Sequence, residues 1–216
     1  MVFEFSSPQR SVAVLAQRGG GSGQEWFEQM ESGSGGMQPL KMVEEVLRQA
    51  QLEREQIEGI AVGLGPGSYT GIRAALALAQ GWQLARGMRL IGVSSADSIA
   101  AEAFDEGLRG PVAVVIDAQR NEVYCGDYEL SDSGWSSTQA LRVVSAAGVL
   151  EARNNGRLLI GPEVTRWVPD GKQIFPRAVA AGKLALAGTS SVAGEKLEPI
   201  YLRPIQFVKA PPPRVA

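Results

Sequence analysis

The chain has 216 residues, enough for one large domain or two small ones that bury a core without disulfide bonds. Its 21 Lys and Arg residues against 23 Asp and Glu residues give a net charge of -2, which disfavours autonomous binding to nucleic acid. The sequence contains no histidine, the commonest general base and metal ligand, so most hydrolase mechanisms lose their central residue.

Signals for redox environment and targeting are few. The single cysteine, Cys125, forms neither an internal disulfide nor a thiolate metal site by itself, which indicates a reducing compartment. The first residues show no basic segment followed by a long apolar run, so no secretory signal is predicted. The longest uncharged apolar run, residues 74–85, is much shorter than the roughly 18 residues of a membrane-spanning helix. We therefore expect a cytoplasmic protein without a membrane segment.

The chain opens with three predicted strands. Residues 2–5 and 11–16 are rich in β-formers and flank a polar turn, which predicts a hairpin. Residues 25–30 carry aromatic side chains and are expected to add a third antiparallel strand.

Two helices flank a short strand in the next part of the chain. Pro39 fits the first position of a helix over residues 40–50. Its apolar stripe is made of Leu40, Val43, Leu47 and Ala50. Residues 59–63 predict a short buried strand, and residues 70–86 a long helix that Gly87 ends.

The second half of the chain repeats the build of the first. Later elements are predicted as strands over residues 90–93, 112–117, 122–130 and 158–160, and as helices over residues 95–104 and 177–187. Residues 112–130 predict two strands joined by a polar turn, which resembles the first hairpin. We therefore predict that the second half of the chain repeats the architecture of the first. Gly and Pro residues over 107–111 indicate a boundary. We expect an α/β protein with domains over residues 1–107 and 108–203, and a mobile tail over residues 204–216.

A glycine-rich loop joins the strand over residues 59–63 to the helix over residues 70–86. Free amides and the positive end of a helix dipole meet there, which suits an anion such as phosphate. The loop lacks the Lys of a P-loop, and Thr70 stands where GxGxxG needs its last Gly. In the structural alternative, the glycines permit positive φ while Ser68 or Thr70 caps the helix. The motif consists of Gly65, Pro66, Gly67, Ser68, Tyr69, Thr70, Gly71 and Arg73.

Three segments together resemble the bacterial TsaB family. They are GPGSYTGIR at residues 65–73, followed by a small-residue helix and IGVSS, then DAQRNEVY at residues 117–124, and EPIYLR at residues 198–203. The resemblance spans most of the chain. It implies two related actin- and sugar-kinase-like domains (ASKHA, RNase H-like), each a mixed sheet with helices. It also implies a role in making threonylcarbamoyladenosine beside the anticodon of tRNA.

The resemblance further implies a division of labour between subunits. In that pathway TsaB is the non-catalytic partner. Its relative TsaD carries the threonylcarbamoyl transfer and holds a metal through histidines, whereas TsaE is an ATPase that joins the pair. We therefore expect a scaffold that binds and activates TsaD together with TsaE, forms a homodimer when alone, and reaches tRNA only through the complex. No metal or tightly bound cofactor is expected on this chain, whereas ATP or ADP is compatible with the complex.

The first two predicted helices are the expected partner surface. By periodicity alone, both apolar stripes face their own sheet. The resemblance instead places these helices against TsaD or a second copy, in a four-helix arrangement. The expected interface residues, some of them exposed in the monomer, are Leu40, Val43, Leu47, Ile72, Ala75, Leu76 and Ala79.

An enzyme is the alternative function: an ATP-using transferase, or the peptidase that the family's older glycoprotease label suggests. Asp117 ends a predicted strand where related kinases place a metal-associated carboxylate, although a turn-capping role is the plainer interpretation. Glu4 and Asp97 are the other acid–base candidates, but nothing in the sequence brings two of these carboxylates together.

Three further positions bear on the function. Residues 4–7 read Glu-Phe-Ser-Ser where the family usually has an apolar residue followed by Asp-Thr-Ser, which puts nucleotide contact through this turn in doubt. Arg73 opposes the helix dipole, so it is expected either to have a carboxylate or phosphate partner or to be solvated. Cys125, without a histidine to activate it, is predicted to be a small core residue.

Overall fold

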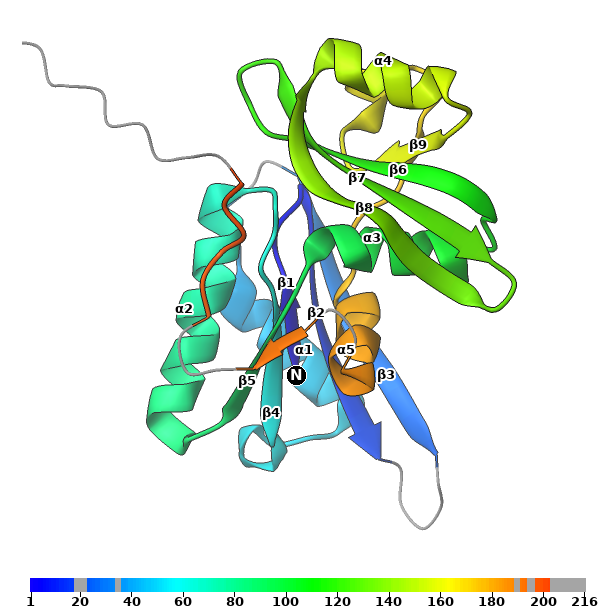
Figure 1. The fold of residues 1–216 in the computed structure, drawn as a ribbon. Coiled ribbons are helices and arrows are strands. Elements are labelled where there is room, and N and C mark those ends of the chain that lie inside the picture. The colour runs from blue at the N-terminus through cyan, green and yellow to red at the C-terminus, as the bar shows by residue number, and fades with distance from the viewer. Residues whose placement is uncertain (18–22, 34–35, 189–190, 194–196, 203–216) are drawn as a thin grey trace, which may run out of the picture.

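The computed structural model describes residues 1–17, 23–33, 36–188, 191–193 and 197–202. They form two mixed β-sheets, one above the other in Figure 1. The strands of the first sheet are β1 (Val2–Glu4), β2 (Gln9–Gln17), β3 (Gln24–Ser32), β4 (Gly59–Gly63), β5 (Arg89–Val93) and β11 (Ser191–Ala193). Their order is β11-β5-β4-β1-β2-β3. Because β2 pairs antiparallel with both β1 and β3, the predicted hairpin and third strand are confirmed.

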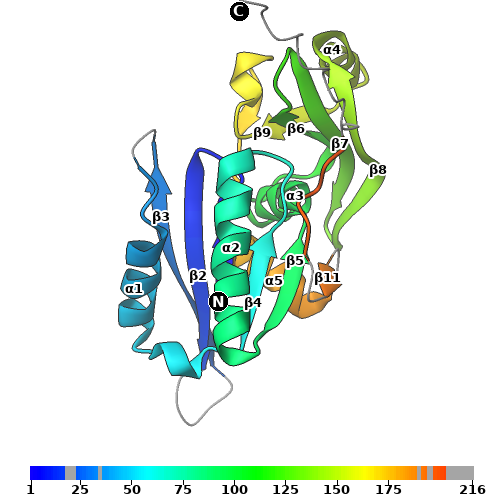
Figure 2. The same cartoon turned by 90° about the vertical axis from the view of Figure 1, so that its left-hand side faces the viewer.

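Helices cover both faces of the first sheet. The helices are α1 (Pro39–Ala50), α2 (Tyr69–Arg86), α3 (Ser95–Asp105), α4 (Ala146–Asn154) and α5 (Ala178–Ala187), with short 3-10 turns at Arg54–Gln56 and Val164–Arg166. α1 and α2 cover one face of the sheet and α5 the other (Figure 2). Side chains alternate along the strands, so Phe3 and Val12 pack with α1 and α2, whereas Val2 and Ala13 lie against α5. In the described part of the chain, no helix is both long and apolar enough to span a membrane.

The apolar stripes of α1 and α2 face the first sheet. Leu40 is 59% exposed, but the six other residues expected at a partner interface are buried, namely Val43, Leu47, Ile72, Ala75, Leu76 and Ala79. The expectation that this set forms a surface is therefore wrong for those six residues. A stripe with helical period buries the most apolar area when it faces its own sheet, which leaves the opposite side of each helix to the outside.

The second sheet repeats the core of the first. Its strands are β6 (Gly110–Asp117), β7 (Glu122–Ser131), β8 (Gly134–Ser145), β9 (Leu158–Gly161) and β10 (Lys172–Gln173), in the order β10-β9-β6-β7-β8. β6 pairs antiparallel with β7 and parallel with β9, just as β1 pairs with β2 and β4. The predicted duplicated architecture is thus confirmed, although the sequence patterns predict neither β8 nor α4.

One helix lies between the two sheets and another covers the outer face. α3 packs Ile99 and Ala100 against the second sheet and Ala101 toward α5. α4 covers the far face of the second sheet through Val149 and Ala152 (Figure 1). The two sheets are therefore joined through a shared helical layer.

The chain returns to the first sheet after the second is complete. α5 packs against β1, β2 and β4, and β11 pairs with β5. Leu197 is buried in the first core, and the Ile200 amide donates to the Leu64 carbonyl at 2.9 Å. The predicted segment 108–203 therefore contributes to both sheets. The domain limits stay a prediction, and the tail over residues 204–216 lies outside the described residues.

Candidate functional site

The glycine loop between β4 and α2 lies directly against the backbone of residues 5–6. Gly67 has a φ of 148°, a conformation that side chains rarely adopt. A Cβ on Gly67 would overlap the carbonyl oxygen of Ser6, and a Cβ on Gly71 would overlap that of Phe5. The close approach of two backbones therefore requires glycine at both positions.

The amides of this loop are largely used within the chain. Four of them donate hydrogen bonds: Leu64 to the Val93 carbonyl (2.8 Å), Gly65 to Ser95 Oγ (3.1 Å), Ser68 to the Ser6 carbonyl (2.7 Å) and Gly71 to Ser68 Oγ (3.2 Å). Ser68 rather than Thr70 is thus the N-cap of α2. These four amides are not free to bind a phosphate, and the helix cap of the structural interpretation is present.

The N-cap gives a first testable prediction. We expect Ser68→Ala to lower the free energy of unfolding by about 1 kcal/mol, because the Gly71 amide loses its acceptor. Thr70→Ala is the matched control, since Thr70 is exposed in the same turn, and its effect should stay within about 0.5 kcal/mol. Urea denaturation followed by circular dichroism measures both variants. Equal losses would contradict the assignment of Ser68 as the cap.

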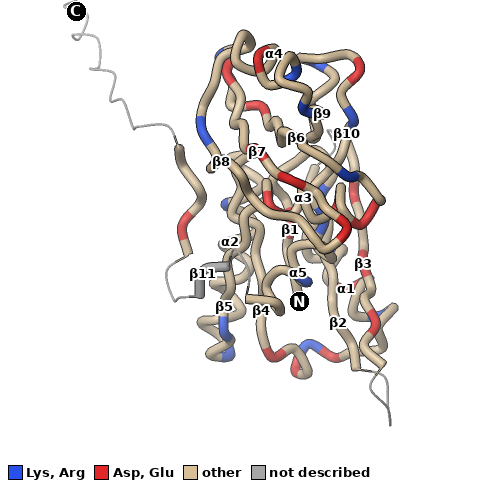
Figure 3. The backbone as a smooth tube through the Cα atoms, turned by 45° about the vertical axis from the view of Figure 1, so that its right-hand side comes forward, with Lys and Arg blue, Asp and Glu red and all other residues tan. Residues whose placement is uncertain are grey.

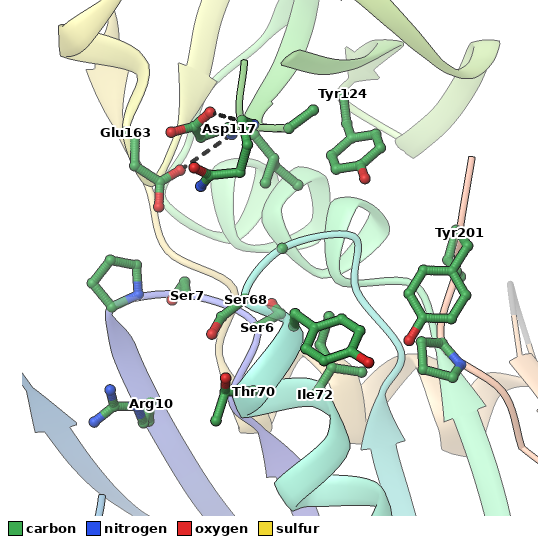
Figure 4. Close-up of a pocket in the computed structure, with 18 of the residues that line it drawn as sticks. Ser6, Ser7, Arg10, Ser68, Thr70, Ile72, Asp117, Tyr124, Glu163 and Tyr201 are labelled. Carbon is green, nitrogen blue, oxygen red and sulfur yellow. Dashed lines mark hydrogen bonds between the residues drawn. The ribbon is translucent and has the colours of Figure 1, made fainter. Parts of the chain in front are cut away.

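A cavity of about 760 Å³ opens between the two sheets beside the glycine loop (Figure 4). The side of the first sheet lines it with Ser6, Ser7, Arg10, Ser68 and Thr70. The side of the second sheet lines it with Asp117, Gln119, Tyr124 and Glu163. Tyr201 reaches it from the segment that returns to the first sheet. The cleft thus joins residues from both halves of the chain.

The carboxylates of the cleft are engaged with the protein around them. Asp117 Oδ1 accepts a hydrogen bond from the Gln119 amide at 2.8 Å, and its Oδ2 pairs with Arg166 at 2.6 Å, which confirms the turn-capping interpretation. Burial raises the pKa of Glu163, and the nearby Asp117 carboxylate raises it further. Asp97, the third acid–base candidate, does not line the cleft and accepts a hydrogen bond from the Tyr128 hydroxyl at 2.7 Å. Among the described residues, no three His, Cys, Asp or Glu side chains are grouped to hold a metal ion.

Arg73 has an aromatic environment instead of an anionic one. Its Nε donates to the Tyr201 hydroxyl at 3.3 Å, and its guanidinium lies 4.3 Å from the centre of the Tyr69 ring. The expected carboxylate or phosphate partner is therefore replaced by a phenol. The contact joins the GPGSYTGIR and EPIYLR segments, so the two motifs meet in space although 128 positions separate the paired residues.

Other predicted and missed residues complete the site. Cys125 is buried, as predicted, and burial raises the pKa of its thiol. Sequence reasoning missed Glu163 and Arg166, which lie in a region of weak periodicity and have no motif around them. Tyr201 could have been identified from the sequence, because it belongs to the EPIYLR segment.

Comparisons with known proteins identify the family of the chain. A family model described as TsaD, tRNA N6-adenosine threonylcarbamoyltransferase, matches residues 38–203. The Escherichia coli K12 protein named tRNA threonylcarbamoyladenosine biosynthesis protein TsaB is 29% identical over 181 residues, which are 76% of this chain and 78% of that protein. A protein of the same name from Haemophilus influenzae is 36% identical over 85 residues, 39% of this chain and 36% of that protein. The chain belongs to the TsaB family.

Solved structures similar to this TsaB-family chain show the same fold. A Pseudomonas aeruginosa structure described as YeaZ has a TM-score of 0.72 at 24% identity, covering 93% of this chain and 98% of that one. A second, described as an uncharacterized protein with similarity to peptidase YEAZ from the same organism, has a TM-score of 0.74 at 24% identity, covering 94% and 98%. The expected fold class, two related ASKHA-like units of mixed sheet and helices, is confirmed.

Proposed function

We propose that this chain is a non-catalytic partner subunit in the synthesis of threonylcarbamoyladenosine on tRNA, where it binds and activates a TsaD-type transferase together with TsaE. Family membership supports this role, because the relatives in Escherichia coli and Haemophilus influenzae are named as biosynthesis proteins of this nucleoside. The matching family model describes a threonylcarbamoyltransferase. The observation that carries the proposal is an uncovered face of α2.

The outward row of α2 is small and apolar. Ala77, Gly81 and Leu84 follow one another at spacings of four and three, so they lie on one side of the helix. All three are exposed, and Leu84 is 88% exposed. Small side chains let a second helix approach closely, and covering the leucine removes apolar area from water. This outward row is the proposed contact with the transferase, and with a second copy when the chain is alone.

The three acid–base candidates of the sequence support the non-catalytic part of the proposal. Asp117 is paired with Arg166, Asp97 with Tyr128, and Glu4 is buried beneath the glycine loop. No two of these three carboxylates meet in a geometry that serves general acid–base chemistry. Basic and acidic residues are interspersed along both sheets (Figure 3), which fits contact with tRNA only through the complex.

A reconstitution tests the role. TsaD, TsaE and the carbamoyl-adenylate-producing enzyme of the same organism are combined with tRNA, and threonylcarbamoyladenosine is measured with and without this chain. We expect modification to require the chain. Ala77→Glu should abolish both binding to the transferase and modification, because it introduces an unpaired charge at the contact. Ala140→Glu, the same substitution at an exposed position of β8, should leave both unchanged.

The alternatives give different results. Modification that proceeds equally well without the chain would overturn the scaffold role. Loss of activity in both Glu variants would show that charge alone, and not the outward row of α2, is responsible. Tight ATP binding by the purified chain alone, abolished by changes in the glycine loop, would favour the ATP-using transferase.

A further inference from the structure

Glu4 is a fully buried glutamate beneath the glycine loop, at the end of β1. Space for its carboxyl group exists because the adjacent residue of β4 is Gly63, where a Cβ would overlap the Glu4 carboxylate. Buried carboxyl groups are costly unless they have hydrogen-bond partners. The contacts of Glu4 therefore decide what it does.

The partners of Glu4 form a directed chain of hydrogen bonds. Its Oε1 accepts from the Ser6 amide at 2.9 Å, and its Oε2 accepts from the Ser95 hydroxyl at 2.9 Å. The Ser6 side chain is a further hydrogen-bond partner of the carboxyl group. Ser95 Oγ in turn accepts from the Gly65 amide at 3.1 Å. A serine hydroxyl has one hydrogen to donate, and here it is directed to Glu4. Both carboxyl oxygens act as acceptors, which is the arrangement of an ionised glutamate.

Protonation of Glu4 is incompatible with this arrangement. A proton on Oε1 would face the Ser6 amide, which is itself a donor. A proton on Oε2 would point at Ser95 Oγ, which already accepts the Gly65 amide. The hydroxyl hydrogen of Ser95 would then lose Glu4 as its acceptor and would need another one. Either way one contact must rearrange. Burial raises the pKa of Glu4, while the hydrogen bonds from Ser6 and Ser95 lower it, so the net change brings protonation nearer to neutral pH.

Most charged side chains on the surrounding elements are engaged elsewhere. They are Arg73 of α2 with Tyr201, Arg86 of α2 with the carbonyls of Arg54 and Glu55, Asp97 of α3 with Tyr128, Glu102 of α3 with Arg177, and Asp105 of α3 with Lys183. Arg10 of β2 lies 3.9 Å from Glu31, and its buried Nη1 has no hydrogen-bond partner within the part of the chain that the structure describes. Hydrogen bonds and burial, and no ion pair, thus set the state of Glu4 among the described residues.

Ser6 and Ser95, the partners of Glu4, also form hydrogen bonds with the backbone of the glycine loop. The Ser6 carbonyl accepts the Ser68 amide, and the Ser95 amide donates to the Gly65 carbonyl at 2.8 Å. Gly67 lies against the same Ser6 carbonyl, without room for a side chain. A rearrangement at Ser6 or Ser95 therefore displaces the loop and the first turn of α2.

We propose that Glu4, the Ser95 hydroxyl and the Gly65 amide form a proton-linked latch, which holds the glycine loop and the first turn of α2 while Glu4 is ionised and releases them when Glu4 is protonated. Glu4 is a positioning residue in this device. The latch is a property of the free chain and is independent of the transferase partner.

The test is a pH titration of the full chain by nuclear magnetic resonance, which follows the Gly65 amide and the Glu4 side-chain carboxyl carbon. In the unaltered chain we expect both signals to shift together, with one midpoint above the ordinary glutamate pKa of about 4.3. In Glu4→Gln the Gly65 shift with pH should be lost, because the amide side chain resembles the protonated acid. Glu58→Gln, at an exposed glutamate, should leave the Gly65 titration unchanged.

A second variant keeps the test decisive if Glu4→Gln does not fold. In Ser95→Ala the Glu4 carboxyl should still titrate, but the Gly65 amide should follow it much less, because only the indirect route through Ser6 remains. A Gly65 signal that ignores pH in the unaltered chain, that titrates in Glu4→Gln, or that follows Glu4 undiminished in Ser95→Ala would overturn the latch.

Discussion

Gly71→Ala is expected to lower the free energy of unfolding by about 3 kcal/mol or more. The Cα of Gly71 lies against the Phe5 carbonyl, so an added methyl group would overlap a backbone atom and not a flexible side chain. To relieve the overlap, the first turn of α2 must move away from the end of β1. That movement also weakens the bond from the Ser68 amide to the Ser6 carbonyl. Urea denaturation at neutral pH measures the loss.

The same helix offers a matched control in Gly81. No atom lies within 4 Å of a Cβ placed on Gly81, and this residue occupies the interior of α2. Gly81→Ala should therefore raise the free energy of unfolding by up to about 1 kcal/mol, the difference in helix propensity between the two residues. If Gly71→Ala proves as harmless as Gly81→Ala, the close approach between α2 and β1 is wrong.

Arg177→Ala should cost about 3 kcal/mol or more at neutral pH. Arg177, directly before α5, donates to Glu28 of β3 and to Glu102 of α3, the latter at 3.0 Å. These carboxylates are 7% and 13% exposed, so removing the arginine leaves two nearly buried negative charges without their counter-ion. Denaturation of the variant and the unaltered chain across a pH series gives the difference.

The loss should become smaller in acid. Burial raises the pKa of Glu102 above its ordinary value, so the folded state binds that proton more tightly than the unfolded chain. The contribution of such a group favours folding at low pH and is lost as the pH rises through the raised pKa. Without Arg177, repulsion between the two carboxylates raises this pKa further, and protonation in acid relieves the repulsion.

Lys183→Ala is the control for the loss of a positive charge at the same helix. Lys183 pairs with Asp105 of α3, and both side chains are about half exposed, so solvent screens the pair. The expected change is below about 1 kcal/mol. Losses of equal size in the two variants, or a loss for Arg177→Ala that does not depend on pH, would contradict the role assigned to the buried carboxylates.

Most of the fold is readable from the sequence, since short apolar runs between polar turns mark the strands of both sheets. β8 escapes prediction because residues 136–140 are exposed at the edge of the second sheet and carry no apolar alternation. α2 is predicted as a helix, and periodicity alone places its stripe of Ile72, Leu76 and Ala79 against the sheet, where the structure has it. The resemblance assigns the same stripe to a partner, which is the part that is wrong.

The site is less readable than the fold. The sequence narrows the cap of α2 to Ser68 or Thr70, and the hydrogen bond from the Gly71 amide identifies Ser68. The sequence does not predict the burial of Glu4, because that burial depends on Gly63 and on the Ser95 hydroxyl, which is 91 positions away. The pairing of Arg177 with Glu28 spans 149 positions, and no local pattern records it.

The return of α5 to the first sheet has a consequence for synthesis of the protein. On the ribosome, β1 to β5 emerge long before α5, with all of the second sheet translated in between. During that interval the apolar face formed by Val2, Ala13 and Val93 has no α5 to cover it. Exposed strand faces in nascent chains are prone to aggregation. The first sheet is thus vulnerable until translation has passed α5, and a chain cut between the sheets would keep that face permanently in contact with water.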